Sequence, residues 1–195
     1  MTKKMKVLVA GACMMGIFAA RANSQAPAEQ AKASADVAVA YNPTMANVGG
    51  GYGFSMQGAS VQVHCQFFRG WGVVADVAGL HATMLTHSTA GLDLVTATFG
   101  PRYTWSPAHH RLSLFGHVLA GEAYGMNSIF PSAGGVSSSA NSFALEMGGG
   151  MNLPLSRHID LRAFEADWLR TELPNSTTNI QNNLRVGAGF VFRNR

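Results

Sequence analysis

Lysine is absent from the chain after residue 32. Three of the four lysines, Lys3, Lys4 and Lys6, lie at the extreme N-terminus, and the fourth is Lys32. The formal net charge of +4 therefore reflects a short terminal segment, and the arginines of the remaining chain are scattered. Nucleic-acid-binding proteins need cations clustered on one face, so we expect no nucleic-acid partner.

The chain also lacks an apolar run of about 18 residues, the length that indicates a membrane-spanning helix. Its longest apolar run, 7–20, follows the N-terminal lysines and leads into Ala20-Arg21-Ala22. A basic segment, a short apolar run and small residues at a cleavage site are typical of a signal peptide. We therefore predict a cleaved signal peptide over 1–22, with cleavage after Ala26 as the alternative, a flexible tail over 23–35 and one domain over 36–195.

Cysteine is scarce, with only Cys13 and Cys65 in the chain. Cys13 lies inside the predicted signal peptide, where residues 10–12 lack the leucine expected before a lipid-attachment site. Removal of the signal peptide leaves Cys65 alone, so no intramolecular disulfide can form. Cys65 falls on the apolar face of a predicted strand and is expected to behave as a small hydrophobic residue.

What the sequence does contain is strict alternation of apolar residues with small or polar ones. It is clearest over 183–192, where one face carries Leu184, Val186, Ala188, Phe190 and Phe192. Side chains alternate faces along a β-strand, and about ten residues is the length that a tilted strand needs to cross a membrane. We interpret this segment as the closing strand of a membrane barrel.

The same alternation predicts eight strands. They cover 36–42, 58–67, 72–80, 92–105, 111–124, 142–153, 158–170 and 183–192. The connections alternate between long segments (44–56, 81–91, 125–141 and 171–181) and short turns (68–71, 106–110 and 154–157). An even strand number with tight turns at one end and longer loops at the other is typical of bacterial outer-membrane barrels. The predicted fold class is all-β, an eight-stranded antiparallel transmembrane up-and-down β-barrel.

Aromatic residues gather near the predicted strand ends at two levels, as expected of girdles at the two membrane interfaces. The short-turn level holds Phe67, Phe68, Trp71, Tyr103, Trp105 and Phe192, and the long-loop level holds Tyr41, Tyr124, Phe143 and Trp168.

A soluble barrel would place the apolar faces inside and the opposite faces in water. Those opposite faces carry mostly Gly, Ser, Thr and Ala, with few charges and no lysine. A soluble surface is roughly a quarter to a third charged, which these faces do not approach. The small residues therefore suit the narrow interior of a membrane barrel, with the apolar faces towards lipid.

The signal peptide, eight strands, aromatic girdles and closing Phe190-Val191-Phe192 segment resemble the OmpA-type outer-membrane β-barrel domain family. The resemblance covers 36–195 and implies the same small barrel fold. The family strand usually ends the protein on an aromatic residue, whereas Arg193-Asn194-Arg195 follow here. The peptidoglycan-binding domain of the larger members is absent from the sequence, so we expect no cell-wall tether.

The predicted inward faces carry a polar network. Its members are His64, Asp76, Arg102, His117, Glu146, Arg162 and Arg185. Buried charges persist when they are paired and hydrogen-bonded, so we expect Glu146 to pair with at least one arginine. The network could line a gated pore or proton path, or it could fill the interior as a structural plug. We favour the plug, because the interior of so small a barrel is usually filled.

The seventh predicted strand breaks the alternation. Ile159, Leu161 and Ala163 face lipid, and continued alternation would place Glu165 and Asp167 there too. Either a β-bulge near Ala163 shifts the alternation, or the two acids lie at the outer rim.

Catalysis would need a nucleophile, a histidine and an orienting carboxylate. The local candidates are His87-Ser88 in a predicted loop and Ser113 with His117 on one strand. Seven histidines and many serines make chance pairs common, so we expect no enzyme. No group has zinc spacing, since His109 and His110 are too close to form a site alone, and we expect neither metal nor cofactor.

We therefore expect an outer-membrane protein with a structural or surface-interaction role through its outer loops. The alternatives are a narrow solute pore and, less favoured, a lipid-modifying enzyme. The expected partners are outer-membrane lipid and the barrel-insertion machinery, which would engage the C-terminal strand. The sequence does not identify an extracellular partner.

Overall fold

The computed structural model describes residues 34–47, 53–83, 91–107, 112–175 and 178–194. The predicted signal peptide over 1–22, and all but the last two residues of the predicted tail over 23–35, lie outside the described residues. The described segments belong to one compact unit, Ala31–Arg195. No helix among them is long and apolar enough to cross a membrane.

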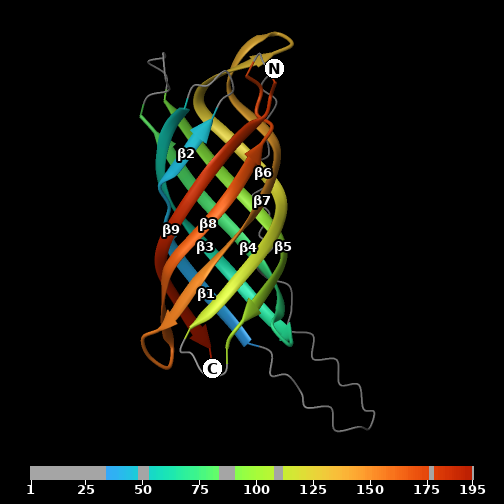
Figure 1. The fold of residues 1–195 in the computed structure, drawn as a ribbon. Coiled ribbons are helices and arrows are strands. Elements are labelled where there is room, and N and C mark those ends of the chain that lie inside the picture. The colour runs from blue at the N-terminus through green and yellow to red at the C-terminus, as the bar shows by residue number, and fades with distance from the viewer. Residues whose placement is uncertain (1–33, 48–52, 84–90, 108–111, 176–177, 195) are drawn as a thin grey trace, which may run out of the picture. The chain divides into compact units, whose positions relative to one another are not determined.

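The described residues form nine strands in one antiparallel sheet. Their bounds are β1 (Ser34–Tyr41), β2 (Thr44–Asn47), β3 (Gly53–Phe68), β4 (Trp71–Ala82), β5 (Leu92–Trp105), β6 (Ser113–Ser132), β7 (Gly135–Pro154), β8 (Ile159–Thr171) and β9 (Gln181–Asn194). From β3 onward each strand pairs with the next, and β1 pairs with both β3 and β9. The last pairing closes the sheet into a ring (Figure 1). The predicted antiparallel up-and-down barrel is confirmed.

β1 and β2 together act as the first strand of an eight-stranded barrel. Both pair with β3 on one side and β9 on the other, and neither register shifts between them. The interruption falls at Pro43, which has no N–H to give to a ladder. The ladder nevertheless continues, because Asn42 N donates to Gly58 O at 2.8 Å and Val186 N donates to Pro43 O at 3.0 Å.

Burial alternates along the strands in the phase that the sequence predicts. On β3, Val61 is 45% exposed, whereas its neighbours Ser60 and Gln62 are 2% and 1% exposed. The same pattern leaves Val39, Val77 and Phe99 on the outside, together with many other large apolar residues. Most large apolar side chains of the strands therefore face outward, and the interior holds small, polar and charged residues together with one apolar cluster.

The predicted loop over 125–141 is wrong, because most of it is strand. β6 continues to Ser132 and β7 begins at Gly135, so a two-residue turn joins two long strands. The ladder has one irregularity, between Met126 and Phe130. Ladder bonds join backbone groups, so a segment rich in serine and glycine can pair as well as an apolar one. The predicted loop over 44–56 is likewise partly strand, in β2 and the start of β3.

A β-bulge in β8 decides the position of the two acids that the sequence left open. Opposite β7, Arg162 pairs with Asn152 and Phe164 pairs with Met151, so Ala163 is an extra residue on its strand. The register with β9 shifts at the same place. An extra residue reverses the alternation that follows it. Glu165 and Asp167 therefore point into the barrel, where each is 1% exposed.

Candidate functional site

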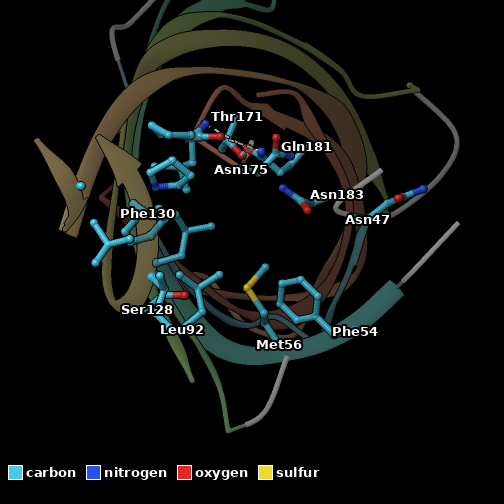
Figure 2. A pocket seen from close by; sticks show the side chains of 17 residues that line it. Asn47, Phe54, Met56, Leu92, Ser128, Phe130, Thr171, Asn175, Gln181 and Asn183 are labelled. Carbon is cyan, nitrogen blue, oxygen red and sulfur yellow. Dashed lines mark hydrogen bonds between the residues drawn. The ribbon is translucent and has the colours of Figure 1, made fainter. Parts of the chain in front are cut away.

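The barrel interior has two regions along its length. At the long-loop end, where β6 turns into β7 and β8 leads to β9, the inward residues form an apolar cluster. It consists of Ala46, Met56, Leu80, Ala82, Leu92, Leu94, Ala123, Phe130, Ala144, Leu169 and Leu173. A cavity of about 520 Å³ lies at this end (Figure 2). At the short-turn end, where β3 turns into β4 and β7 into β8, the inward residues are mainly polar or charged.

The structure places all seven residues of the predicted interior network inside the barrel. All seven are buried, and so are the two acids behind the bulge. The seven are His64, Asp76, Arg102, His117, Glu146, Arg162 and Arg185, and the two acids are Glu165 and Asp167. The break in alternation had left two positions open for these acids, inside the barrel behind a bulge near Ala163 or at the outer rim. The structure has the first of these.

Arg185 is the centre of the larger ion-pair group. Its Nη2 lies 2.7 Å from Asp76 Oδ2 and 3.0 Å from Asp167 Oδ2, and it also pairs with Glu146. Its Nε donates a second bond to Asp167 Oδ2 at 3.2 Å. The three carboxylates come from β4, β7 and β8, so one guanidinium on β9 joins four strands. Glu146 thus lies against an arginine.

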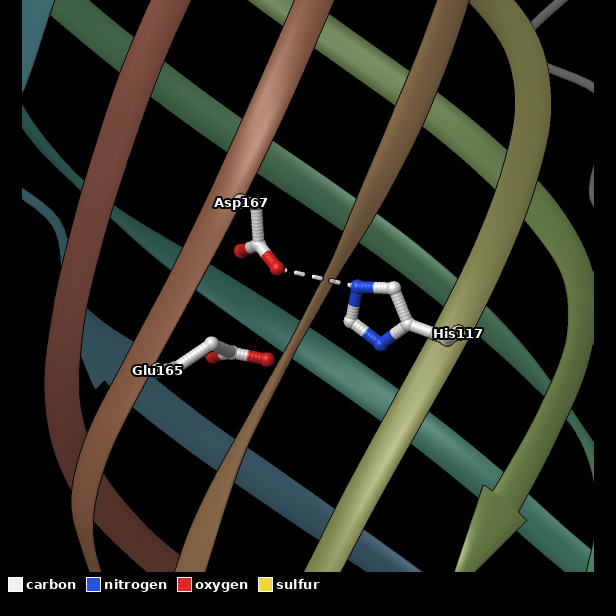
Figure 3. A group of neighbouring side chains, drawn as sticks. All are labelled: His117, Glu165 and Asp167. Atoms are coloured by element: carbon white, nitrogen blue, oxygen red, sulfur yellow. Dashed lines mark hydrogen bonds and ion pairs between the residues drawn. The ribbon is translucent and has the colours of Figure 1, made fainter.

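His117 extends this group across to β6. Its Nε2 lies 3.0 Å from Asp167 Oδ1 and 3.5 Å from Glu146 Oε1. Figure 3 shows the imidazole of His117 facing Asp167, with Glu165 beside it. Thr98 Oγ1 donates to the other oxygen of Glu146 at 3.2 Å. The carboxylates of Asp167 and Glu146 are thus each held by partners on more than one side.

A second group surrounds Arg162. Its Nη1 lies 3.1 Å from Glu165 Oε2, and its Nε donates to Asn152 Oδ1 at 3.2 Å. Gln62 joins the pair from across the barrel: its Oε1 accepts from Arg162 Nη1 at 2.6 Å, and its Nε2 donates to Glu165 Oε1 at 2.9 Å. Gln62 was not among the residues predicted for the network.

Arg102 is stabilised differently. It forms no ion pair with a carboxylate among the described residues, and its Nη1 has only a long contact of 3.5 Å with Gln62 Oε1. Its guanidinium carbon lies 3.6 Å from the centre of the Phe115 ring, and that of Arg162 lies 4.7 Å from the same ring. A cation over an aromatic face is attracted by the ring. Phe115 is therefore an interior member of the site that sequence reasoning missed.

His64 lies apart from both groups. Its Nδ1 is 3.1 Å from Asp36 Oδ2, near the start of β1 at the short-turn end. A smaller cavity of about 200 Å³ lies beside this pair, with Arg102 and Asn152 on its wall. Of the seven predicted residues, the structure thus joins Asp76, Glu146, His117 and Arg185 in one group, gives Arg162 a second, and leaves His64 with its own partner.

Glycine makes room for the network at one position in particular. A Cβ on Gly148 would lie 2.0 Å from Asp167 Oδ1 and 2.4 Å from the carbonyl oxygen of Ala166. Only a residue without a side chain allows the carboxylate of Asp167 to lie over β7. The position of Asp167 between Arg185 and His117 therefore depends on Gly148.

His117, Glu165 and Asp167 also form the one group with the composition of a metal site among the described residues. Each offers a ligand atom, and these atoms lie within 4.8 Å of one another. The carboxylates are, however, already paired with Arg162 and Arg185. A cation here would have to displace a guanidinium, so the donor set does not fit a resident metal.

Of the two candidate catalytic pairs, only Ser113 and His117 fall within the described residues. His87 and Ser88 lie outside them. Ser113 Oγ accepts a bond from Arg193 Nη2 at 3.4 Å, while His117 Nε2 faces carboxylates. A serine nucleophile needs a hydrogen bond to its histidine, and the structure gives Ser113 no such bond.

The predicted aromatic residues all lie exposed on the outside of the barrel. At the short-turn end Trp71 and Tyr103 are opposite each other on β4 and β5, with ring centres 5.1 Å apart. The others exposed at this end are Phe67, Phe68, Trp105 and Phe192, and those towards the long-loop end are Tyr41, Tyr124, Phe143 and Trp168.

Comparison with known proteins identifies the fold. No family model matches the sequence, and no curated protein matches it. The crystal structure of Neisserial surface protein A matches with a TM-score of 0.58 and 11% identity, over 82% of this chain and 96% of that chain. The crystal structure of Ail, the attachment invasion locus protein of Yersinia pestis, matches with a TM-score of 0.54 and 18% identity, over 82% of this chain and 98% of that chain.

Identities this low establish the fold alone. The chain has the fold of the small eight-stranded outer-membrane barrels. The resemblance to the OmpA-type barrels holds at this level.

Proposed function

We propose that the protein is an integral outer-membrane barrel with a closed lumen and a structural or surface-interaction role. The observation that carries the closed lumen is the position of Arg185. Its ion pairs join β9 to β4, β7 and β8, and so reach across the interior instead of following one wall. The interior of an eight-stranded barrel is just wide enough for side chains to fill. The network around Arg185 would therefore act as a plug.

The outward face supports a location in the membrane. Large apolar side chains are exposed on every long strand, for example Val61, Val77, Phe99 and Leu184. Exposure of so much apolar surface to water would be unfavourable, whereas outer-membrane lipid would cover it. The signal peptide over 1–22 would direct export, and β9 would engage the barrel-insertion machinery.

A surface role would involve the long-loop end of the barrel. Ail has been crystallised in complex with the heparin analogue sucrose octasulfate, a polyanion. This chain has no lysine after residue 32, and the exposed Arg170 near this end is already paired with Glu172. Polyanion binding needs unpaired cations, so we do not extend that ligand class to this protein.

We also propose that the protein is not an enzyme. Ser113 contacts Arg193 instead of a histidine, and His117 is held between carboxylates. These contacts support a packed interior in preference to a reactive one. The narrow pore is the remaining alternative, and conductance separates it from the plug.

The test is a planar-bilayer recording of the purified wild-type protein beside Glu146→Gln. The wild type should show no steady conductance. Glu146→Gln removes one of the three charges around Arg185, so it should lower stability and can admit intermittent conductance. Glu172→Gln, the same change at an exposed acid, is the matched control and should behave as the wild type. A stable, steadily open wild-type channel would contradict the plug and favour the pore.

A further inference from the structure

We propose that the cavity at the long-loop end is a binding site for one hydrocarbon chain that carries an uncharged hydrogen-bonding group. The inference goes beyond the closed lumen and does not depend on it, because the cavity lies in the apolar region of the interior.

The described walls of the cavity are mainly apolar and carry no charge. Met56, Leu92, Leu94, Phe130 and Leu173 line it, and no lining residue carries a charge. Figure 2 shows Met56 and Phe54 on one side of the hollow and Asn183 opposite them. Small-molecule sites are typically apolar cavities of about 300–1,000 Å³ with a few placed polar groups. The volume of about 520 Å³ falls in that range.

The barrel wall limits the ligand to a slender molecule. An eight-stranded barrel can hold at most one small ligand. Next to the cavity the interior continues with the buried side chains of Leu80, Ala144 and Leu169. A ligand entering from the long-loop end would therefore meet an apolar floor.

Asn183 is the one fully buried polar side chain of the described wall that is left for a ligand. Asn183 is only 3% exposed, and its amide forms no side-chain hydrogen bond with any described residue. Figure 2 shows this amide directed towards the hollow. An amide offers both a donor and an acceptor. A ligand hydroxyl, ester or ketone inside the cavity could therefore hydrogen-bond to this amide.

The neighbouring amide is not free for this role. Gln181 Oε1 accepts from Thr171 Oγ1 at 3.0 Å and from Leu173 N at 2.9 Å, and Gln181 Nε2 donates to Leu173 O at 2.8 Å. These bonds fix the segment after β8 against the start of β9. They therefore form one wall of the cavity in advance, and Asn183 is left as the recognition group.

The lining also defines what the site should reject. A carboxylate or phosphate in an apolar site needs a cation or several donors, and the lining has no cation. A neutral alcohol should therefore bind better than the carboxylate of the same chain length. This preference tests the lack of a cation in the lining, whereas saturation of the Met56 shift and its loss in the variants below distinguish a built site from simple partition.

The experiment is a methyl NMR titration of the full barrel in lipid nanodiscs, with ¹³C-labelled methionine methyl groups. Met56 lines the cavity, and Met147, on the outer face of β7, is the internal control. The probes are 1-dodecanol and ionised dodecanoate. We expect a saturable shift of the Met56 methyl with 1-dodecanol, and at least about tenfold weaker binding of dodecanoate. Met147 should respond only in proportion to the probe dissolved in lipid.

Two pairs of variants test the site itself. Asn183→Leu should weaken 1-dodecanol binding by roughly five- to tenfold, as expected for one hydrogen bond, and Asn182→Leu, on the opposite face of β9, should leave it unchanged. Leu173→Trp should fill the cavity and abolish the Met56 shift, whereas Leu184→Trp adds the same ring on the lipid face. Parallel shifts of Met56 and Met147, or a Met56 shift that survives Leu173→Trp, would overturn the proposal.

The bound hydrocarbon chain could belong to a membrane lipid or to a free molecule, and the same sample distinguishes these two sources. Cross-relaxation between the Met56 methyl and lipid chains before any probe is added would identify a lipid chain. Its absence, with saturable 1-dodecanol binding, would identify a free molecule. Failure of the titration would leave the bilayer recordings unaffected, so the two proposals can fail separately.

Discussion

Arg162 and Gln62 lie 100 residues apart in the chain, yet Arg162 Nη1 donates a 2.6 Å hydrogen bond to Gln62 Oε1. The same amide donates to Glu165. A neutral side chain from β3 thus holds both members of an ion pair from β8. The barrel interior depends on such contacts between distant strands as well as on pairs of opposite charge.

Gln62→Leu should therefore be destabilising although it removes no charge. It leaves Arg162 and Glu165 each without one buried hydrogen bond, which should cost about 1–3 kcal/mol. Urea unfolding in lipid vesicles measures this change. Gln57→Leu is the control: Gln57 only accepts an exposed bond from Tyr41, so its loss should cost much less. Equal stabilities of the two variants would show that the Gln62 bonds contribute little.

Arg185→Met should be among the most damaging changes. It leaves Asp76, Glu146 and Asp167 close together without their shared cation, and breaking a buried pair costs about 3–5 kcal/mol. A second change, Asp167→Asn, should recover part of the loss, since it removes one of the unpaired charges. The same vesicle unfolding assay applies to both.

The exposed arginine of β8 provides the control for Arg185→Met. Arg170 pairs with Glu172 at 3.1 Å near the barrel rim, and exposed pairs contribute about 0–1 kcal/mol. Arg170→Met should therefore be nearly silent. A comparable loss at both sites would argue that position in the interior is not what matters.

Val186→Arg tests which face of β9 meets lipid. Near the middle of the strand an arginine on the lipid face should cost about 2–4 kcal/mol. Asn182→Arg, on the same face near the long-loop end, should cost only about 0–1 kcal/mol, because the penalty falls towards the interface. Unfolding measurements in vesicles should show this gradient. Unchanged stability of Val186→Arg would mean that this face does not contact lipid.

Gly148→Ala tests the close approach of β8 to β7. The added Cβ would meet both Asp167 Oδ1 and the backbone oxygen of Ala166, and overpacking of this kind costs about 1–3 kcal/mol. The matched control is Gly79→Ala, where a Cβ would have no atom within 4 Å. Only the first variant should lower the urea midpoint. If both are neutral, β8 can move away from β7 without penalty.

The fold was predictable because apolar residues recur at every second position along a barrel strand, so even a short segment shows the pattern. Alternation over ten residues identifies both the strand and its two faces, as for Leu184 and Arg185 on β9. The extent of strand was harder to predict. Most of residues 125–141 pair through their backbone groups, and the composition of the side chains does not predict that pairing.

The interior was predictable only where one face is clearly polar. Glu165 and Asp167 were left open because the single extra residue at Ala163 has no compositional mark. The apolar region was missed for a different reason: Leu94 and Leu169 each have an apolar neighbour on the outward face, Val95 and Trp168. Alternation between two kinds of apolar residue gives no inward direction, so the cavity at this end could be found only in three dimensions.

The pairing of β1 with β9 has a consequence for how the molecule forms. These strands come from opposite ends of the sequence, so their ladder cannot be completed before the rest of the chain is in place. Contacts between distant segments form slowly, because chain entropy must be lost before they stabilise anything. Until then β1 and β9 are open edges that could add a strand from another copy. The β1–β9 ladder is therefore the last to close. Its closure also removes the two open edges at which copies of the chain could aggregate.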